Sequence, residues 1–195
     1  MDRACELELV RRLRTGDPEA FDAVHEAFNG RLYNFLARLA NHRDVAEDLL
    51  EETWLRLVKH APRLRPDTRL GAWLFTVARN LHANYCRSRL LEDSHAGGLM
   101  GLWPHGRPGP SPFEALEASE TGRRLAVALA SVPIAYREAL LLVGVEGLRH
   151  ADAAEICGVT TETMRQRLSR ARALLARRLD EAEVPLLASL KEITT

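Results

Sequence analysis

Arginine and glutamine side chains crowd one stretch of the chain, between residues 160 and 179. These side chains belong to Arg165, Gln166, Arg167, Arg170 and Arg172. Glu162 is the only acidic residue in the same stretch. An arginine guanidinium can bind both acceptors on a guanine edge, and a glutamine amide can bind an adenine edge in the same way. The composition therefore favours contact with DNA, although an ordinary solvated basic helix would have a similar one.

Two helices joined by a tight turn would present these side chains. Residues 150–156 predict a short helix, residues 157–159 predict a turn, and Thr160 can cap a long final helix. Ala154 is small where the two helices must approach, and Gly158 supplies a backbone conformation that a Cβ atom disfavours. This arrangement is typical of a helix-turn-helix, whose second helix enters the major groove.

An acidic stripe is expected on an earlier helix, over residues 44–61. It consists of Asp44, Glu47, Asp48 and Glu51. Asp44 can cap this helix, with Glu47 spaced for the return bond of a capping box. Carboxylates on one face can bind a basic partner, but acids near a helix N-terminus are also favoured by the helix dipole. Both interpretations stay open for Asp44 and Glu47.

A basic loop interrupted by prolines is expected over residues 62–68, before a helix over residues 70–89. Trp73 lies in the first turn of that helix. A tryptophan on a helix is more often a core residue than a binding residue.

The composition predicts an all-α protein with two helical domains joined by a flexible linker. Ala, Leu, Arg and Glu dominate, and these residues favour helices. Gly, Pro, His and Ser interrupt any periodicity after Leu91. We expect a first domain over residues 1–91, a linker over 92–115, a second domain over 116–182 and a C-terminal tail over 183–195.

The charge and cysteine content exclude several classes of protein. There are 27 basic and 27 acidic side chains, so oppositely charged faces would meet different partners. Cys5, Cys86 and Cys157 are too far apart for a disulfide framework, which fits a reducing cytoplasm. His82 and Cys86 lie one helical turn apart, but without an evident third ligand we predict neither a metal site nor a cofactor. No apolar run is long enough for a membrane span, so no membrane insertion is expected.

The second half resembles region four of extracytoplasmic-function (ECF) sigma factors of the sigma-70 family, which are specificity subunits of bacterial RNA polymerase. The matching motifs are Pro133 before Tyr136-Arg137-Glu138, Glu146-Gly147-Leu148, Ala154-Glu155-Ile156, Gly158-Val159, Thr163 and Arg167-Leu168-Ser169-Arg170-Ala171-Arg172. The first half resembles region two of the same family. Its motifs are Gly16-Asp17, Ala20-Phe21, the segment from Ala46 to Trp54 and the segment from Ala72 to Leu81.

The resemblance implies three sets of contact residues. Those for the −35 promoter element are Arg149, His150, Thr163, Arg165, Gln166, Arg167, Ser169 and Arg170. Those for the −10 element and its melting are Arg63, Arg65, Thr68, Arg69, Trp73, Arg79, Asn80 and Arg87. Those for polymerase are Asp48, Leu49, Glu51, Glu52, Thr53 and Trp54.

The resemblance also implies the partners. They are core RNA polymerase, through the clamp of its β′ subunit and the flap of its β subunit, promoter DNA, and an anti-sigma protein. The chain departs from the family pattern at Glu51, Asn84, Arg149-His150 and Thr160-Thr161-Glu162. The promoter sequence therefore does not carry over from any relative.

Three other classes compete with this interpretation. A helix-turn-helix repressor or response-regulator output domain would leave the first half unexplained. A zinc-binding anti-sigma protein needs a His-x3-Cys-x2-Cys cluster, and residue 89 is an arginine. An enzyme would need a catalytic motif, but the sequence has no glycine-rich phosphate loop and no nucleophile elbow. We therefore expect no catalysis by this chain.

Overall fold

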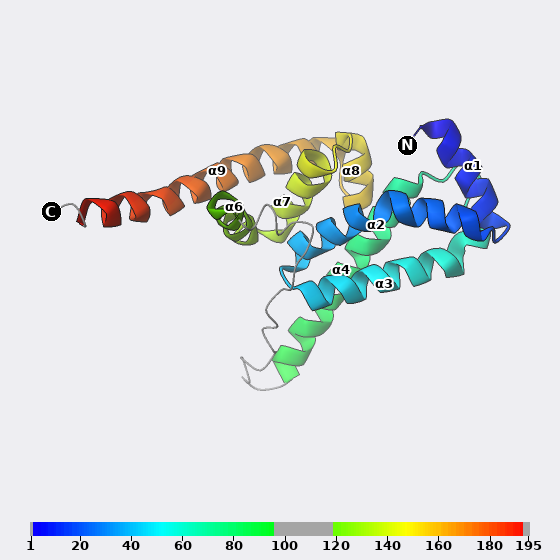
Figure 1. Cartoon of the computed structure of the whole chain (residues 1–195), viewed down its shortest axis with the longest axis horizontal. Coiled ribbons are helices and arrows are strands. Elements are labelled where there is room, and N and C mark those ends of the chain that lie inside the picture. Colours follow the sequence, from blue (N-terminus) through cyan, green and yellow to red (C-terminus); the bar gives the residue numbers. More distant parts are fainter. Residues whose placement is uncertain (1, 96–118, 193–195) are drawn as a thin grey trace. The chain divides into compact units, whose positions relative to one another are not determined.

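A computed structural model describes residues 2–95 and 119–192 (Figure 1). Within these ranges all regular structure is helical, which confirms the all-α prediction. The chain divides into two compact units, and the two described ranges belong to the first and the second unit respectively. None of the helices in the described ranges is long and apolar enough to cross a membrane.

The first unit is a helical bundle. Its elements are α1 (Arg3–Arg14), α2 (Pro18–Ala40), α3 (Arg43–His60), the short 3-10 helix η1 (Ala61–Arg63) and α4 (Leu70–His95). Helices α2, α3 and α4 pack against one another in pairs, and α1 packs on α2 and η1. Phe35 of α2 meets Phe75 of α4 edge to face in the core, with ring centroids 5.3 Å apart.

The turn between α1 and α2 is fixed by Asp17. One of its oxygens accepts a hydrogen bond from the backbone N–H of Glu19 at 3.0 Å, and Pro18 follows in the first turn of α2. The other oxygen binds Arg12 at 2.7 Å. The hydrogen bond from Arg12 lowers the pKa of the Asp17 carboxyl, and backbone hydrogen bonds act in the same direction. Asp17 therefore caps α2.

The capping prediction for α3 was wrong. The helix begins at Arg43, with His42 in the cap position and no side-chain cap bond. Asp44 lies inside the first turn, and Glu47 pairs with Arg43 at 2.7 Å instead of returning to Asp44. Because the cap position lies two residues earlier than expected, Asp44 falls within the first turn and acts there as an acid near the positive end of the helix dipole.

The second unit consists of α6 (Glu120–Ala130), α7 (Ile134–Ala139), the π-helical turn η2 (Leu140–Val145), α8 (His150–Cys157) and α9 (Thr161–Glu192). Helix α9 packs on α6, α7 and α8. Arg137 is buried and donates to the carbonyls of Ala130 and Val132 at the end of α6. Cys157 is also buried, with its Sγ 3.8 Å from the Glu138 carboxylate.

The expected linker over residues 92–115 lies mostly outside the described residues. Its first four residues, 92–95, continue α4. At the other end of the chain, residues 183–192 continue α9 without interruption. The long final helix therefore extends past the expected end of the second domain.

Candidate nucleic-acid and polymerase interfaces

Helices α8 and α9 form the helix-turn-helix that the sequence predicts. Gly158 joins them with a left-handed backbone, at a φ of 64°. The backbone N–H of Val159 then binds the carbonyl of Ala154 at 3.0 Å, which closes the end of α8. Thr160 accepts from the N–H of Thr163 at 3.1 Å and caps α9. The turn and the cap therefore set the angle at which α9 leaves α8.

The exposed side of α9 presents most of the predicted −35 contacts. Arg165, Gln166, Ser169 and Arg170 are exposed, while Thr163 and Arg167 are half-buried. Glu162 lies among them and holds two of them. Its carboxylate lies 3.4 Å from Arg165 and 3.3 Å from Gln166.

At the start of α8, Arg149 forms two hydrogen bonds to Asp152, at 2.9 and 3.1 Å. The Asp152 side chain is 6% exposed, whereas that of Arg149 is 74% exposed. A buried carboxylate thus orients an arginine that remains open to a partner. His150 beside it is half-buried.

The six predicted polymerase contacts on α3 separate into two groups. Asp48 and Glu51 are exposed, and Glu52 pairs with Arg56 at 2.9 Å. The other three are buried: Leu49, Thr53 and Trp54. The Thr53 hydroxyl donates to the carbonyl of Leu49 within α3 at 2.7 Å. The Trp54 indole N–H donates to Asn29 of α2 at 3.0 Å, so this side chain joins the two helices.

Sequence reasoning missed two apolar residues on the same surface. Leu55 and Val58 are each 57% exposed. Counted from Asp48 along α3, Glu51 lies three residues, Leu55 seven residues and Val58 ten residues farther on. This helical spacing places all four side chains on one face. We call these four residues the α3 face. Its helical spacing could have been recognised in the sequence.

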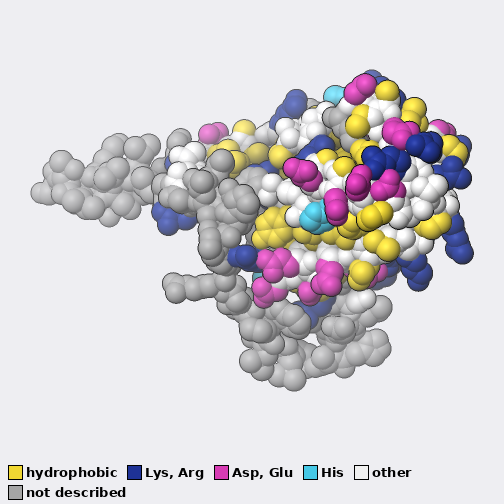
Figure 2. All heavy atoms as spheres, turned by 45° about the vertical axis from the view of Figure 1, so that its right-hand side comes forward, with side chains coloured by type: hydrophobic (Ala, Val, Ile, Leu, Met, Phe, Trp, Pro, Cys, Tyr) yellow, Lys and Arg dark blue, Asp and Glu magenta, His cyan; other side chains and the backbone are white. Residues whose placement is uncertain are grey.

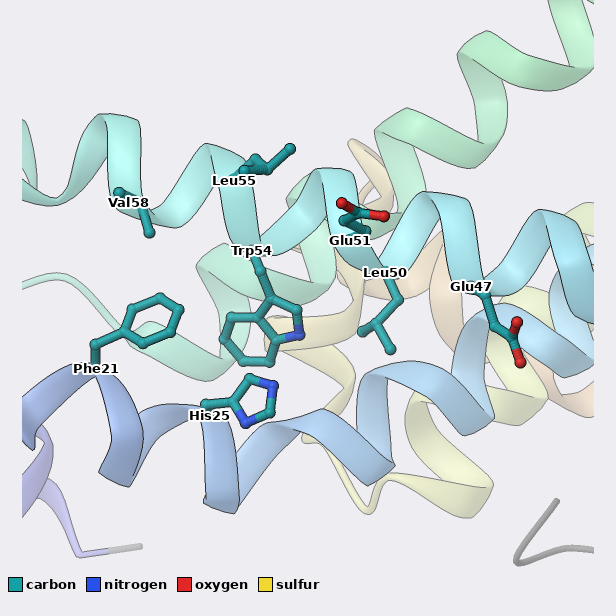
Figure 3. A pocket seen from close by; sticks show the side chains of 8 residues that line it. All are labelled: Phe21, His25, Glu47, Leu50, Glu51, Trp54, Leu55 and Val58. Atoms are coloured by element: carbon teal, nitrogen blue, oxygen red, sulfur yellow. The ribbon is translucent and has the colours of Figure 1, made fainter. Parts of the chain in front are cut away.

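A pocket of about 420 Å³ lies between α2 and α3 and includes three residues of the α3 face, Glu51, Leu55 and Val58 (Figure 3). It is lined by Phe21, His25, Glu47, Leu50, Glu51, Trp54, Leu55 and Val58. Figure 3 shows Trp54 projecting from α3 toward His25 on α2, and their ring centroids are 4.8 Å apart. Figure 2 shows hydrophobic and acidic side chains gathered next to one another on the surface of the molecule. The lining of the pocket has this same mixed character.

The predicted −10 loop follows η1. Arg63, Arg65 and Arg69 are exposed, and Thr68 is half-buried. The N–H of Thr68 binds the carbonyl of Arg65 at 3.0 Å, which makes a tight turn through residues 66 and 67. The Arg65 guanidinium lies 3.2 Å from Asp67. The loop therefore has a defined backbone shape and carries several cations.

Helix α4 continues from this loop. Trp73 is half-buried, with its ring centroid 6.3 Å from that of His60. Trp73, Asn80 and Arg87 follow at intervals of seven residues, or two helical turns, so they lie along one face. Arg79 contacts Asn80 at 3.5 Å and is half-buried. The structure therefore aligns Trp73, Asn80 and Arg87 beyond the loop.

His82 and Cys86, the only pair considered for a metal, lie close together on α4. The Cys86 sulfur is 3.6 Å from Nε2 of His82. Among the described residues, no group of three or more His, Cys, Asp or Glu side chains could hold a metal ion. The two side chains thus contact each other across one turn of α4.

Comparison with known proteins identifies the family. Residues 24–90 match the family model Sigma-70 region 2, and residues 122–175 match Sigma-70, region 4. The ECF RNA polymerase sigma factor EcfG of Rhodopseudomonas palustris (strain TIE-1) is 37% identical over 142 residues, which are 73% of this chain and 75% of EcfG. The chain belongs to the ECF sigma factors.

Other relatives agree with this assignment. The RNA polymerase sigma factor CarQ of Myxococcus xanthus is 29% identical over 90% of this chain and 98% of CarQ. The sigma factor RpoE of Bartonella quintana, solved with the anti-sigma factor NepR, superposes with a TM-score of 0.65. It is 28% identical, and the match covers 82% of this chain and 97% of RpoE.

Membership in this family decides between the competing functions. A sigma factor binds core RNA polymerase and directs promoter-specific transcription, so the protein is not a conventional helix-turn-helix repressor. Sigma factors are non-enzymatic initiation factors that act together with RNA polymerase. The two matched regions lie in different units of the chain, one with the acidic α3 face and one with the basic α9.

Proposed function

We propose that the two units divide promoter recognition between them. Residues 1–91 bind core polymerase and read the −10 element, and residues 116–182 read the −35 element. The opposite charges of two surfaces carry this proposal. The α3 face is acidic and apolar, whereas the exposed start of α9 has Glu162 as its only acid.

The α3 face would dock on the clamp of the β′ subunit. Asp48 and Glu51 supply exposed charge for a basic partner, and Leu55 and Val58 supply apolar area next to it. Exposed apolar area next to charged groups is typical of protein interfaces. Leu49, Thr53 and Trp54 would act indirectly, because they are buried, and Trp54 ties α3 to Asn29 of α2. The flap of the β subunit would bind the second unit.

The loop after η1 would capture bases of the −10 element. Its arginines attract the phosphate backbone, and Thr68 offers a hydroxyl at the end of the turn. Trp73 could stack on the last paired base, while Asn80 and Arg87 follow the separated strand along α4. Stacking on an aromatic ring contributes about 1–3 kcal/mol per base and tolerates any base.

Helix α9 would enter the major groove at the −35 element. Arg165 and Gln166 lie in its first two turns, where side chains reach base edges. Arg170 lies farther along and would bind phosphates, with Arg167 and Ser169 beside it. Arg149 and His150 would approach the DNA backbone from the start of α8, and Thr163 supports the cap.

We further propose that an anti-sigma protein controls this factor in the cytoplasm. The support is the likeness to RpoE of Bartonella quintana, which was solved with an anti-sigma factor. Covalent chemistry would remain with core polymerase, so this chain would contribute promoter choice and melting alone.

Run-off transcription tests the proposed function. Purified core polymerase is supplied with genomic promoter fragments, with and without this chain. We expect discrete transcripts only when the chain is present, and loss of each transcript when either upstream element is scrambled. Transcripts that persist after either the −10 or the −35 element is scrambled would refute the division of roles between the two units.

A further inference from the structure

Arg3, in the first turn of α1, reaches the loop that follows η1. Its Nη2 donates to the carbonyl of Asp67 at 2.7 Å, and its Nη1 donates to the carbonyl of Thr68 at 3.3 Å. The same guanidinium binds the carboxylate of Glu6 at 2.6 Å. A single side chain therefore joins the beginning of the chain to two consecutive peptide groups more than sixty residues away.

The shape of the loop explains why these carbonyls are available. The turn through residues 66 and 67 uses the N–H of Thr68 and the carbonyl of Arg65. The carbonyl of Asp67 lies in the second half of this turn and that of Thr68 at its end, before the first helical bond of α4, which Trp73 makes to Arg69. The rigid fork of an arginine can bind two such acceptors at once, which the single ammonium of a lysine cannot match.

Asp67 links this contact to the cations of the loop. Its backbone carbonyl is held by Arg3, and its side chain lies 3.2 Å from Arg65. Glu6 in turn steadies Arg3, since its own side chain is only 15% exposed. The chain of contacts therefore runs from Glu6 through Arg3 and Asp67 to Arg65.

We propose that Arg3 is a positioning residue for −10 recognition, which fixes the loop in its base-capturing shape before DNA arrives. This inference rests on the proposed function of the loop. Fixing the loop in advance avoids an ordering cost during promoter opening. A loop held in one shape also cannot rearrange to fit other bases, so it favours the correct −10 bases. Arg3 itself need not touch DNA for this effect.

The matched control is Arg11 on the same helix. It pairs with Glu8 at the same spacing, with an N–O distance of 2.6 Å, as Arg3 pairs with Glu6. It lies eight residues farther along α1, or about 12 Å. Arg11→Ala therefore removes the same charge and the same type of helix pair, but no contact with the loop.

The test compares Arg3→Ala, Arg3→Lys and Arg11→Ala in the full chain. Amide hydrogen exchange of residues 64–70 is measured in the free protein. Promoter opening is measured by fluorescence in the holoenzyme, on templates substituted at the −10 or the −35 element. We expect Arg3→Ala to speed exchange in the loop and to reduce −10 discrimination by about five- to tenfold. Affinity for core polymerase and preference at the −35 element should stay unchanged.

The conservative variant separates position from charge. Arg3→Lys keeps the cation but loses the fork, so we expect it to resemble Arg3→Ala, while Arg11→Ala should resemble the natural protein. A uniform loss on every template, rescued by Arg3→Lys, would mean that Arg3 merely attracts phosphates, and this would overturn the proposal. Unchanged loop exchange in Arg3→Ala would overturn it as well.

A companion variant distinguishes failure of this inference from failure of the proposed function. Thr68→Ala alters the loop directly and leaves Arg3 in place. If Thr68→Ala changes −10 preference and Arg3→Ala does not, only the positioning role is refuted. If Arg3→Ala, Thr68→Ala and Arg65→Ala all leave discrimination among templates substituted at −10 unchanged, the loop does not read this element. Both the positioning role of Arg3 and the proposed function of the loop are then refuted.

Discussion

The carboxylate of Glu162 lies 3.4 Å from the guanidinium of Arg165, one turn farther along α9. Both side chains are more than 60% exposed, so the pair is open to a partner. DNA binding in the proposed orientation would bring the Glu162 carboxylate close to the groove. It would also require Arg165 to break its ion pair with Glu162. The pair therefore opposes binding to any sequence and weakens the contacts that the arginine can make.

Neutralising this acid should strengthen DNA binding. We expect Glu162→Gln to raise holoenzyme affinity for promoter DNA by about two- to fivefold, the size of an exposed ion pair of roughly 0.3–1 kcal/mol. Fluorescence anisotropy on the −35 element measures this change. Asp180→Asn removes an exposed acid about 27 Å farther along the same helix and serves as the control. If Glu162→Gln and Asp180→Asn raised the affinity for DNA equally, the gain would come from the change in net charge alone.

Arg165 and Arg170 should differ in what they recognise. Arg165→Ala should cost about 1–3 kcal/mol on the cognate −35 element and relax preference at one base position, because a bidentate guanine contact is lost. Arg170→Ala should weaken all sequences similarly and lower the salt slope by roughly one unit. Titrations in the holoenzyme over a substituted promoter set measure both. Unaltered base preference in Arg165→Ala would show that Arg165 does not contact a base edge and that the proposed placement of α9 in the major groove is wrong.

The α3 face should decide affinity for core polymerase. Reversing Asp48 and Glu51 to lysine should weaken holoenzyme formation by about tenfold or more, since each exposed ion pair contributes roughly 0.2–1 kcal/mol and reversal adds repulsion. Truncating Leu55 to alanine should add to this loss by removing exposed apolar area. A titration of core enzyme by the labelled factor measures these affinities.

The control for this experiment reverses Glu8 and Glu19, which gives the same change in net charge on α1 and at the start of α2. Both are exposed side chains in ion pairs with arginines. Thermal unfolding should show all variants folded. If the two double reversals weakened binding equally, the interface would not lie on α3.

The Arg12–Asp17 pair should make stability depend on pH in the acid range. The pKa of Asp17 lies below its ordinary value of 3.8, chiefly because of the hydrogen bond from Arg12. Its contribution is therefore present above that value and is lost as the pH falls through the lowered pKa. Asp17→Asn retains a capping side chain but no charge, so the natural protein should be more stable near pH 7, and the difference should shrink below about pH 4. Urea unfolding across this range measures it, and a difference that stays constant would exclude the linkage.

Helix positions and the helix-turn-helix could be predicted because they depend on local signals. Gly158 and Thr160 each act within a few residues of their own position. The cap of α3 could not be predicted this way, because Asp44 and His42 lie within two residues of each other and the sequence permits either start.

The interfaces were harder to predict, because the orientation of a helix depends on its partner. Trp54 and Leu55 are adjacent and both apolar, yet Trp54 is buried against α2 whereas Leu55 remains exposed. The contact of Arg3 with residues 67 and 68 has no local signal at all. Only the tertiary structure brings these segments together.

Because Cys157 is buried, the rate at which a thiol reagent labels it can report the stability of the helix-turn-helix. Cys5 and Cys86 are exposed and belong to the first unit, whereas Cys157 is enclosed in the second. A Cys5→Ser/Cys86→Ser variant would then react with a thiol reagent only when the second unit opens. Its labelling rate would report that opening free energy separately from the first unit, with or without bound promoter DNA.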